Sequence, residues 1–372
     1  MKKSKFSNLL AAVALVSISS YSLAADTIKI GIAGPVTGPV VQYGDMIFAG
    51  ALTAIEEINK TGGVNGAKLE GIKYDDMCDA KQGVAVANKV VSDGVKFVVG
   101  HTCSGPTQVA SNIYDENEVV MITPSATAPE ITGRGYNTIF RTIGLDNMQA
   151  PVAAEYVVDK VKPKAVAVIH DKQQYGEGVA TAFKQAIEAK GIKVVTFEGI
   201  NVGDKDFSSL ITKLKRDNVD FVYFGGYHPE LGMLLRQSHE KGLKAHFMGP
   251  EGAGNPELSA IAGEASEGLL VTLPRSVDSD ARNKAVVEAF NAKKIEAAGA
   301  FVLPSYAAVQ VLAKAMEQAK STDPEKVANA IHKGSFNIVL GDNITFDKKG
   351  DINGFQFAVY QWHKDGTKTL AK

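Results

Sequence analysis

Small hydroxyl-bearing residues follow two apolar runs in a pattern typical of a ligand-binding sheet edge. The run at 97–100 ends in glycine and leads into Thr-Cys-Ser at 102–104, and the run at 119–122 leads into Thr-Pro-Ser-Ala-Thr at 123–127. If both runs are parallel strands, their carboxyl ends lie side by side, where open α/β sheets bind ligands. Backbone N–H groups at a helix start favour an anion such as a carboxylate. We interpret this region as half of a small-molecule cleft.

Two later stretches have the same form and supply different side chains. Tyr227 follows an apolar run that ends in two glycines at 225–226, and Glu251 follows the short strand-like run at 246–248. A carboxylate at Glu251 can bind a cation or serve as a general base, whereas an isolated glutamate is usually a solvated loop residue. Its place directly after a strand favours a functional role.

The remaining motifs argue against nucleotide, metal and nucleophile chemistry. The glycine-rich stretch 31–38 lacks the dinucleotide-binding spacing, and Pro35 removes an N–H that a phosphate needs, so we interpret this stretch as a cleft loop that delivers Tyr43. The seven histidines show no metal-site spacing, and no serine-nucleophile motif occurs. His101 lies near Cys103, but a disulfide-bonded cysteine cannot act as a nucleophile. We therefore expect no cofactor, no metal ion and no enzymatic activity.

The composition is that of a soluble globular chain. It has 372 residues, of which 45% are hydrophobic and 22% charged, and a net charge of -1. This balance gives no electrostatic reason to expect a nucleic acid or an anionic membrane surface as a partner.

The first 24 residues have the pattern of a secretory signal peptide. Lysines at positions 2, 3 and 5 precede an apolar core at 9–16, and Ser22-Leu23-Ala24 is a small-x-small cleavage site. The apolar core is too short to span a bilayer, although a retained anchor is the alternative. No cysteine lies near the cleavage site, so lipid attachment there is not expected. We predict an exported, periplasmic protein that begins near Ala25.

The two cysteines, Cys78 and Cys103, fit that location. An even number of cysteines in an exported protein favours a disulfide, which contributes roughly 3 kcal/mol in the chain-entropy model. Two free thiols are the alternative. A zinc site is disfavoured because no clustered pair of histidines accompanies the cysteines.

Strand and helix patterns alternate in two successive units. The first alternation runs from 28 to 142, and a second begins at 147 and continues to 273. Such alternation indicates parallel strands joined by helical crossovers. The tail shows three helical patterns between 283 and 332 and a late strand at 356–360, and it should pack on the existing units. We expect two α/β lobes whose several crossings form a hinge.

Several longer motifs resemble one family. They are GPVVQYG at 38–44, KYDD at 73–76, AVANKVV at 85–91, MITP at 121–124, HDKQQYGEG at 170–178, GGYHPE at 225–230 and FMGPEG at 247–252. They make the chain similar, over essentially its whole mature length, to the periplasmic leucine/isoleucine/valine-binding proteins of ABC importers.

That resemblance implies a type I periplasmic-binding-protein fold, an α/β fold with two doubly wound parallel-sheet lobes joined by a three-strand hinge. After the signal peptide at 1–24, we assign residues 25–143 plus 275–350 to the N-terminal lobe. Residues 144–274 plus 351–372 form the expected C-terminal lobe.

The resemblance also implies roles for polar residues. In such proteins the ligand α-carboxylate is held by the serine matching Ser104 and by the backbone N–H matching Thr127. The ammonium contacts the carbonyl matching Ser125, the hydroxyl matching Thr127 and the carboxylate matching Glu251. These roles make physical sense, because a zwitterion needs both charges paired when water is excluded.

Aromatic residues complete the implied site. Tyr43, Tyr227 and Phe301 match residues that wall the side-chain pocket, and Tyr175 matches a residue that meets the ligand when the lobes close. Apolar walls of this kind distinguish one methylene by only about 1–3 kcal/mol. Several branched aliphatic amino acids should therefore bind.

Three positions depart from the family pattern, while the cysteines follow it. Thr102 stands where an apolar residue is common, Ser125 stands where alanine is common, and the segment 303–305 also differs. Because of Thr102, the side-chain pocket is expected to be more polar than in other members, whereas Ser125 should matter little if only its carbonyl is used. The resemblance implies a disulfide between Cys78 and Cys103.

The implied function is capture and delivery. We expect a monomeric receptor that closes on leucine, isoleucine or valine and passes it to an inner-membrane ABC permease, with no nucleic-acid partner. One alternative is the same fold with another small amino acid, an amide or an aromatic acid as ligand. A second alternative is an exported enzyme that uses Glu251 as a base.

Overall fold

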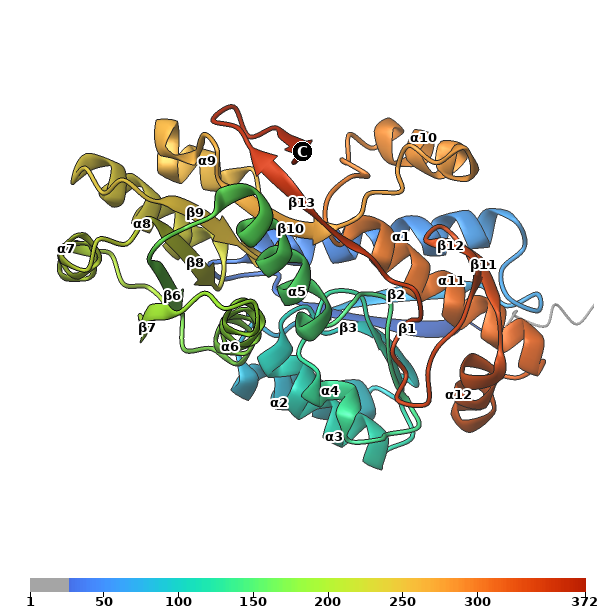
Figure 1. Cartoon of the computed structure of the whole chain (residues 1–372). Helices are drawn as coiled ribbons and strands as arrows, with labels where there is room; N and C mark the ends of the chain where they lie inside the picture. The colour runs from blue at the N-terminus through green and yellow to red at the C-terminus, as the bar shows by residue number, and fades with distance from the viewer. Residues whose placement is uncertain (1–26) are drawn as a thin grey trace, which may run out of the picture.

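The computed structural model describes residues 27–372, so the predicted signal peptide at 1–24 lies outside the described part. Two α/β lobes lie side by side, with β1 to β5 in one and β6 to β10 in the other (Figure 1). The expected pair of doubly wound lobes is therefore confirmed.

The first lobe is built on a five-stranded parallel sheet with the order β2-β1-β3-β4-β5. Its strands are β1 (Ile28–Gly34), β2 (Leu69–Asp75), β3 (Phe97–Gly100), β4 (Val120–Thr123) and β5 (Ile139–Arg141). Its connecting helices are α1 (Val41–Lys60), α2 (Ala80–Ser92), α3 (Ser104–Glu116) and α4 (Glu130–Gly133).

The second lobe is built on a seven-stranded sheet with the order β14-β13-β10-β9-β8-β6-β7. The strands are β6 (Val166–His170), β7 (Val194–Gly199), β8 (Phe221–Gly225), β9 (His246–Gly249), β10 (Leu270–Pro274), β13 (Phe357–Trp362) and β14 (Lys368–Leu370), of which β13 and β14 are antiparallel to their neighbours. Its helices are α5 (Asp146–Tyr156), α6 (Gln174–Ala189), α7 (Ser208–Arg216), α8 (His228–Glu240) and α9 (Glu257–Ala262).

The tail after β10 returns to the first lobe and then crosses back. It forms α10 (Lys284–Ala292), α11 (Val302–Ala319), α12 (Pro324–Lys333) and the hairpin of β11 (Phe336–Ile338) and β12 (Gly341–Ile344). Helix α11 packs against α1, and the chain re-enters the second sheet at β13. The chain thus passes between the lobes three times: after β5, after β10 and after β12.

The two sheets share one topology. In both, the parallel strands follow the chain order 2-1-3-4-5, as β2-β1-β3-β4-β5 and as β7-β6-β8-β9-β10. Strands β3, β4, β6 and β8 are buried along their whole length, as expected when helices cover both faces of a parallel sheet. Ligands bind such sheets beyond the carboxyl ends of the strands, at the point where the strand order reverses. Each lobe therefore presents an equivalent edge.

Gly100 explains how β3 ends beside β1. Its φ of +133° is a conformation that L side chains rarely adopt, and a Cβ at this position would lie 2.3 Å from the Ala33 carbonyl oxygen. Only glycine therefore allows β3 to approach β1 and turn at once toward Ser104.

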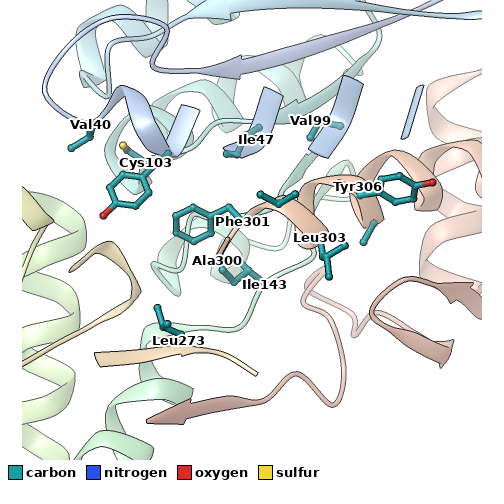
Figure 2. Close-up of a cluster of buried hydrophobic side chains, with 14 of the residues drawn as sticks. Val40, Ile47, Val99, Cys103, Ile143, Leu273, Ala300, Phe301, Leu303 and Tyr306 are labelled. Carbon is teal, nitrogen blue, oxygen red and sulfur yellow. The ribbon is translucent and has the colours of Figure 1, made fainter. Parts of the chain in front are cut away.

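A hydrophobic cluster spans the junction between the lobes. Figure 2 shows Phe301 and Ala300, just before α11, between Ile47 of α1 and Leu273 of β10, and all four belong to one continuous buried cluster. Burial of a large apolar side chain contributes about 1.5–3 kcal/mol. The junction is therefore packed, and does not resemble a loose linker.

The predicted strands and helices between 28 and 360 are present, with ends that differ by a few residues. The second alternation, which begins at 147 in the sequence, opens with helix α5, and a π-helical turn follows it at Val157–Val161. Strands β5, β11, β12 and β14 were not predicted, because they are short and lack the continuous apolar run that marks β3 and β4. Within 27–372, no helix is long and apolar enough to cross a membrane.

Candidate functional site

The carboxyl ends of the two sheets face one small cavity. It encloses about 240 Å³ and is lined by Tyr43, Thr102, Ser104, Ser125, Tyr175, Tyr227, Glu251, Gly252 and Phe301. Every predicted ligand-binding residue except Thr127 lines this cavity. Thr127 is buried next to it and contacts Glu251. Residues predicted from separate sheet edges are thus brought together.

The first lobe contributes hydroxyl groups and a helix start. Ser104 begins α3 directly after β3, and its Oγ accepts a hydrogen bond from the Ala128 N–H at 3.4 Å. The Ser125 hydroxyl donates to the Thr102 carbonyl at 2.7 Å, so this hydroxyl is already used within the lobe. Among the described residues, those of this lobe that line the cavity carry no charge.

The second lobe contributes Glu251, the one charged residue among the described residues lining the cavity. It follows β9, is 1% exposed, and accepts a hydrogen bond on Oε1 from the Thr127 hydroxyl at 3.3 Å. Burial raises the pKa of Glu251 to about 7, although nearby polar groups, among them the Thr127 hydroxyl that donates to it, oppose the rise. Its Oε2 has no hydrogen-bond partner, so it is available to a ligand N–H.

Aromatic rings form the wall between these two polar ends. The Tyr43 ring centroid lies 5.6 Å from that of Phe301 and 5.9 Å from that of Tyr227. The Tyr227 ring in turn lies 5.1 Å from the Tyr175 ring. This wall suits the apolar side chain of a small ligand.

Direct hydrogen bonds between the lobes show that the structure is closed over the cavity. The Tyr43 hydroxyl donates to the Gly252 carbonyl at 2.6 Å, and Gln174 Nε2 donates to Gln108 Oε1 at 2.5 Å. The Gly252 N–H donates to the Tyr175 hydroxyl at 2.9 Å, which fixes the turn after Glu251. A closed cavity with uncharged donors at one end and a carboxylate at the other fits a small zwitterion.

Comparison with known sequences agrees with this geometry. The profile of a family described as periplasmic binding protein matches residues 27–367. The chain belongs to the periplasmic binding protein family. A leucine-, isoleucine-, valine-, threonine-, and alanine-binding protein from Pseudomonas aeruginosa is 63% identical to this family member over 374 residues, which cover 100% of both chains. The resemblance predicted from the motifs is therefore confirmed.

Two solved structures of amino-acid-binding proteins have the same fold as this periplasmic binding protein. A leucine binding protein from Thermotoga maritima is 28% identical with a TM-score of 0.86, and the match covers 93% of this chain and 98% of that one. A branched-chain amino acid transporter substrate binding protein from Streptococcus pneumoniae, solved with isoleucine, is 26% identical with a TM-score of 0.83 and coverage of 93% and 99%. The predicted type I fold is confirmed.

Two residues of this binding protein that support Glu251 were missed in the sequence. Asp146 and Gln149 lie in the first turn of α5, and Gln149 Nε2 donates to Asp146 Oδ1 at 3.2 Å. Both side chains are buried, at 1% and 0% exposure. The available signal was an acidic residue shortly after β5, at the same sheet edge as Ser104 and Thr127.

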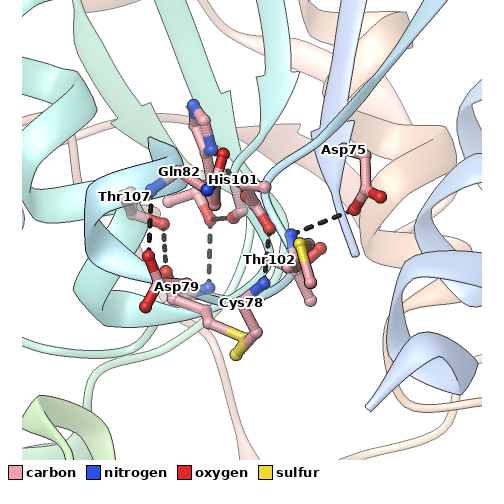
Figure 3. Close-up of polar contacts among 12 residues, drawn as sticks. Asp75, Cys78, Asp79, Gln82, His101, Thr102 and Thr107 are labelled. Atoms are coloured by element: carbon pink, nitrogen blue, oxygen red, sulfur yellow. Dashed lines mark hydrogen bonds and ion pairs between the residues drawn. A yellow bond between two sulfur atoms is a disulfide. The ribbon is translucent and has the colours of Figure 1, made fainter. Parts of the chain in front are cut away.

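The predicted disulfide joins Cys78 to Cys103, with their Cα atoms 5.4 Å apart. Figure 3 shows the surrounding loop, in which Cys78 N–H donates to Asp76 Oδ1 at 2.8 Å and Asp79 accepts from the N–H groups of Lys81 and Gln82 at the start of α2. Because Cys103 immediately precedes Ser104, this loop is tied to the cavity wall.

Both ring nitrogens of His101 have hydrogen-bond partners inside the first lobe. Its Nδ1 lies 2.7 Å from Asp76 Oδ2 and its Nε2 lies 3.0 Å from the Tyr114 hydroxyl, all buried within the first lobe. Neither nitrogen faces the disulfide sulfur as a base would. Among the described residues, no group of three or more potential ligands could hold a metal ion.

Proposed function

We propose that this chain is a periplasmic receptor that closes on branched-chain amino acids and delivers them to an ABC permease. One observation carries the proposal: a closed cavity in which a neutral edge of hydroxyls and N–H groups faces the buried carboxylate of Glu251 across an aromatic wall. Closure is favoured because the ligand bridges both lobes and stabilises the closed state over the open state.

The first lobe's edge contacts both ends of the zwitterion, and Glu251 of the second lobe supplies the charge that pairs with the ammonium. We assign the ligand carboxylate to the Ser104 hydroxyl and the N–H groups at the start of α3 and after β4. We assign the ammonium to Glu251, the Thr127 hydroxyl and the Ser125 carbonyl. The free Oε2 of Glu251 and the committed hydroxyl of Ser125 support this division. Each charge is then paired after water leaves, which a buried charge requires.

The ring wall selects the ligand side chain. Tyr43, Tyr227 and Phe301 surround it, and Tyr175 approaches from the second lobe, so branched aliphatic groups bury the most apolar area. The names of the relatives support leucine, isoleucine and valine as ligands. The discrimination among them is small, since one methylene is worth about 1–3 kcal/mol.

Thr102 favours a second ligand class in the same site. Its hydroxyl is buried against Gly34, has no hydrogen-bond partner, and belongs to a residue that lines the cavity. A ligand hydroxyl is a natural partner for it, so threonine is the runner-up ligand. The Pseudomonas aeruginosa relative also has threonine in its name.

Location, partner and the lack of catalysis complete the proposal. The signal-peptide pattern at 1–24 supports export to the periplasm, with lobes at 25–143 plus 275–350 and 144–274 plus 351–372 acting as a monomer. Family membership supports an ABC permease as the partner. Glu251 is surrounded by hydrogen-bonding groups suited to holding a cation, and we assign it no catalytic step.

Calorimetric titration of ligand-stripped mature protein tests the proposal. We expect tight binding of leucine, isoleucine and valine, weaker binding of threonine and alanine, and recovery of each ligand intact. Absence of binding by the three branched amino acids contradicts the proposed function. Chemical turnover of any of them contradicts the assignment as a receptor.

A further inference from the structure

Glu251 lines the cavity, and a second buried carboxyl group, that of Asp146, is carried by a residue whose backbone N–H donates to the Thr127 carbonyl. Asp146 and Glu251 are each 1% exposed, and each has one oxygen, Oδ2 and Oε2 respectively, with no hydrogen-bond partner. A buried polar atom without a partner costs about 1–3 kcal/mol, and more when it is charged. Two buried carboxyl oxygens without a hydrogen-bond partner, one on each residue, require an explanation.

Thr127 links the chain segments that carry the two carboxyl groups. The Asp146 N–H donates to the Thr127 carbonyl at 3.0 Å, while the Thr127 hydroxyl donates to Glu251 Oε1. Gln149 donates to Asp146, and its own oxygen accepts from the Thr272 hydroxyl at 2.8 Å, which fixes the direction of the amide. The arrangement is therefore a connected network that ties the start of α5 to Glu251.

The nearby cation compensates a second negative charge only in part: Arg141 lowers the pKa of Asp146, but burial outweighs it. Arg141, the nearby cation, lies 2.6 Å from Asp351 and also donates to the Ala126 and Ala128 carbonyls at 2.8 and 3.1 Å. The other titratable groups that face the pair are tyrosine hydroxyls: Tyr175 from α6, Tyr223 from β8, Tyr227 after β8 and Tyr43 from α1. Burial and the nearby carboxylates raise the pKa of each, so they stay neutral.

Charge balance then decides the state of the pair. Arg141 pairs with Asp351, and one ligand ammonium pairs with one carboxylate, so a second ionised carboxyl group is left with no partner in the closed site. The ligand's own carboxylate adds a further negative charge, which makes that state less favourable still. Burial and the charge of Glu251 both raise the pKa of Asp146.

We propose that Asp146 is a protonated positioning residue that donates its O–H toward Glu251, and that amino-acid capture releases one proton from Glu251. This inference rests on the proposed function. When the ammonium arrives, the Glu251 O–H bond breaks, its electron pair stays on the oxygen and the proton goes to water, while the ligand N–H bonds remain intact. The ammonium then binds the free Oε2 of Glu251, and the neutral Asp146 donates to the same carboxylate without adding a second negative charge.

The sign of the pH dependence follows from Glu251. The pKa of Glu251 is about 7 without ligand, and the bound ammonium lowers it. Affinity is therefore highest above pH 7, where Glu251 is already ionised, and falls as the pH decreases through 7. We expect about a tenfold loss of affinity from pH 8 to pH 6, because one pKa unit corresponds to a factor of ten. Release should be most of one proton at pH 6 and small at pH 8.5.

Calorimetry of leucine binding in buffers of different ionisation enthalpy counts these protons on the wild-type protein. In Asp146→Asn, which imitates the protonated acid, affinity should stay within about threefold at pH 7 with the same release. Asp146→Ala should weaken binding about tenfold, and Glu251→Gln should abolish the release. Asp171→Asn is the matched control, because Asp171 is also buried with an unpartnered oxygen and a pKa raised to about 7 by burial.

Each outcome is decisive. Tight leucine binding with no proton release at pH 6 overturns the inference and leaves the proposed function intact. If Asp146→Asn weakens binding as much as Glu251→Gln, Asp146 is ionised and the inference is wrong. Loss of the release in Asp171→Asn assigns the proton to Asp171 and also overturns it. Failure of every amino acid to bind contradicts the proposed function itself.

Discussion

The two lobes have the same strand order and present chemically different edges. The first edge offers Ser104, Ser125 and the start of α3, without a charged side chain among its described cavity residues. The second edge offers Glu251 after β9, with Tyr175 and Tyr227 beside it. Two sheet edges of the same topology thus carry uncharged polar groups in one lobe and a carboxylate in the other.

This difference explains why a single small ligand can hold both lobes. A ligand with two opposite charges can pair its carboxylate with the hydrogen-bond donors of the first edge and its ammonium with the carboxylate of the second edge. Neither edge alone can pair both charges. The two edges are also stabilised by different interactions. The first lobe is cross-linked by the disulfide of Cys78 and Cys103, whereas the second relies on the turn fixed by Tyr175 and Gly252.

Removal of the second lobe's charge should have the largest effect. Glu251→Gln keeps the shape of the side chain and leaves the ligand ammonium unpaired, so leucine affinity should fall about 100-fold or more, since loss of a buried charged partner costs about 2–5 kcal/mol. Calorimetry measures it. Glu230→Gln is the matched control, because Glu230 is buried in the same lobe and accepts from the Gly203 N–H at 2.9 Å. A change below fivefold in Glu251→Gln contradicts the assignment.

Loss of the first lobe's cross-link should be next in size and should act on stability. The double variant Cys78→Ser with Cys103→Ser removes a link between residues 25 apart in the chain, which is worth about 3 kcal/mol. Urea unfolding with and without a reducing agent measures the change. The variant should be insensitive to the reducing agent, and a loss below 1 kcal/mol would show that the loop is held by its hydrogen bonds.

The first lobe's hydroxyl should matter less than the second lobe's charge. Ser104→Ala removes one neutral donor to the ligand carboxylate and leaves the neighbouring N–H groups in place, so affinity should fall about tenfold. Thr107→Ser serves as the control, because the Thr107 hydroxyl donates to the Cys103 carbonyl at 2.7 Å inside the same helix. Equal losses in Ser104→Ala and Glu251→Gln would remove the contrast between the edges.

The smallest effect should be one of selectivity. Thr102→Val replaces the unpartnered hydroxyl by a methyl group of similar size, so threonine should bind about three- to tenfold more weakly while valine binds equally or better. Threonine and valine are themselves isosteric. The affinities of the wild-type protein and of Thr102→Val for these two ligands therefore form a complete double-mutant cycle. Thr196→Val is the control, because the Thr196 hydroxyl in β7 is also buried and unpartnered but lies outside the cavity lining. An unchanged ratio of the two ligands excludes Thr102 from selection.

The sequence predicted the fold and much of the candidate site for an identifiable physical reason. Strand and helix periods extend over many residues, and residues directly after a strand end must lie at the sheet edge, so Ser104, Tyr227 and Glu251 could be placed together. Asp146 could not, because an acidic residue at a helix start is common and is usually solvated. Only the three-dimensional arrangement shows that it is buried beside Glu251. The sequence likewise could not show that Thr127 lies outside the cavity lining and reaches it through its hydrogen bond to Glu251.

Titration with leucine and with its two half-molecules tests the central claim most directly. The claim is that closure needs both charged ends, because the first lobe holds the ligand carboxylate and only Glu251 of the second lobe pairs with the ammonium charge. The two half-molecules are 4-methylpentanoate, which lacks the ammonium, and 3-methylbutylamine, which lacks the carboxylate. Each should bind at least 100-fold more weakly than leucine and should fail to close the lobes in small-angle X-ray scattering. Tight binding or closure with either half-molecule alone would contradict it.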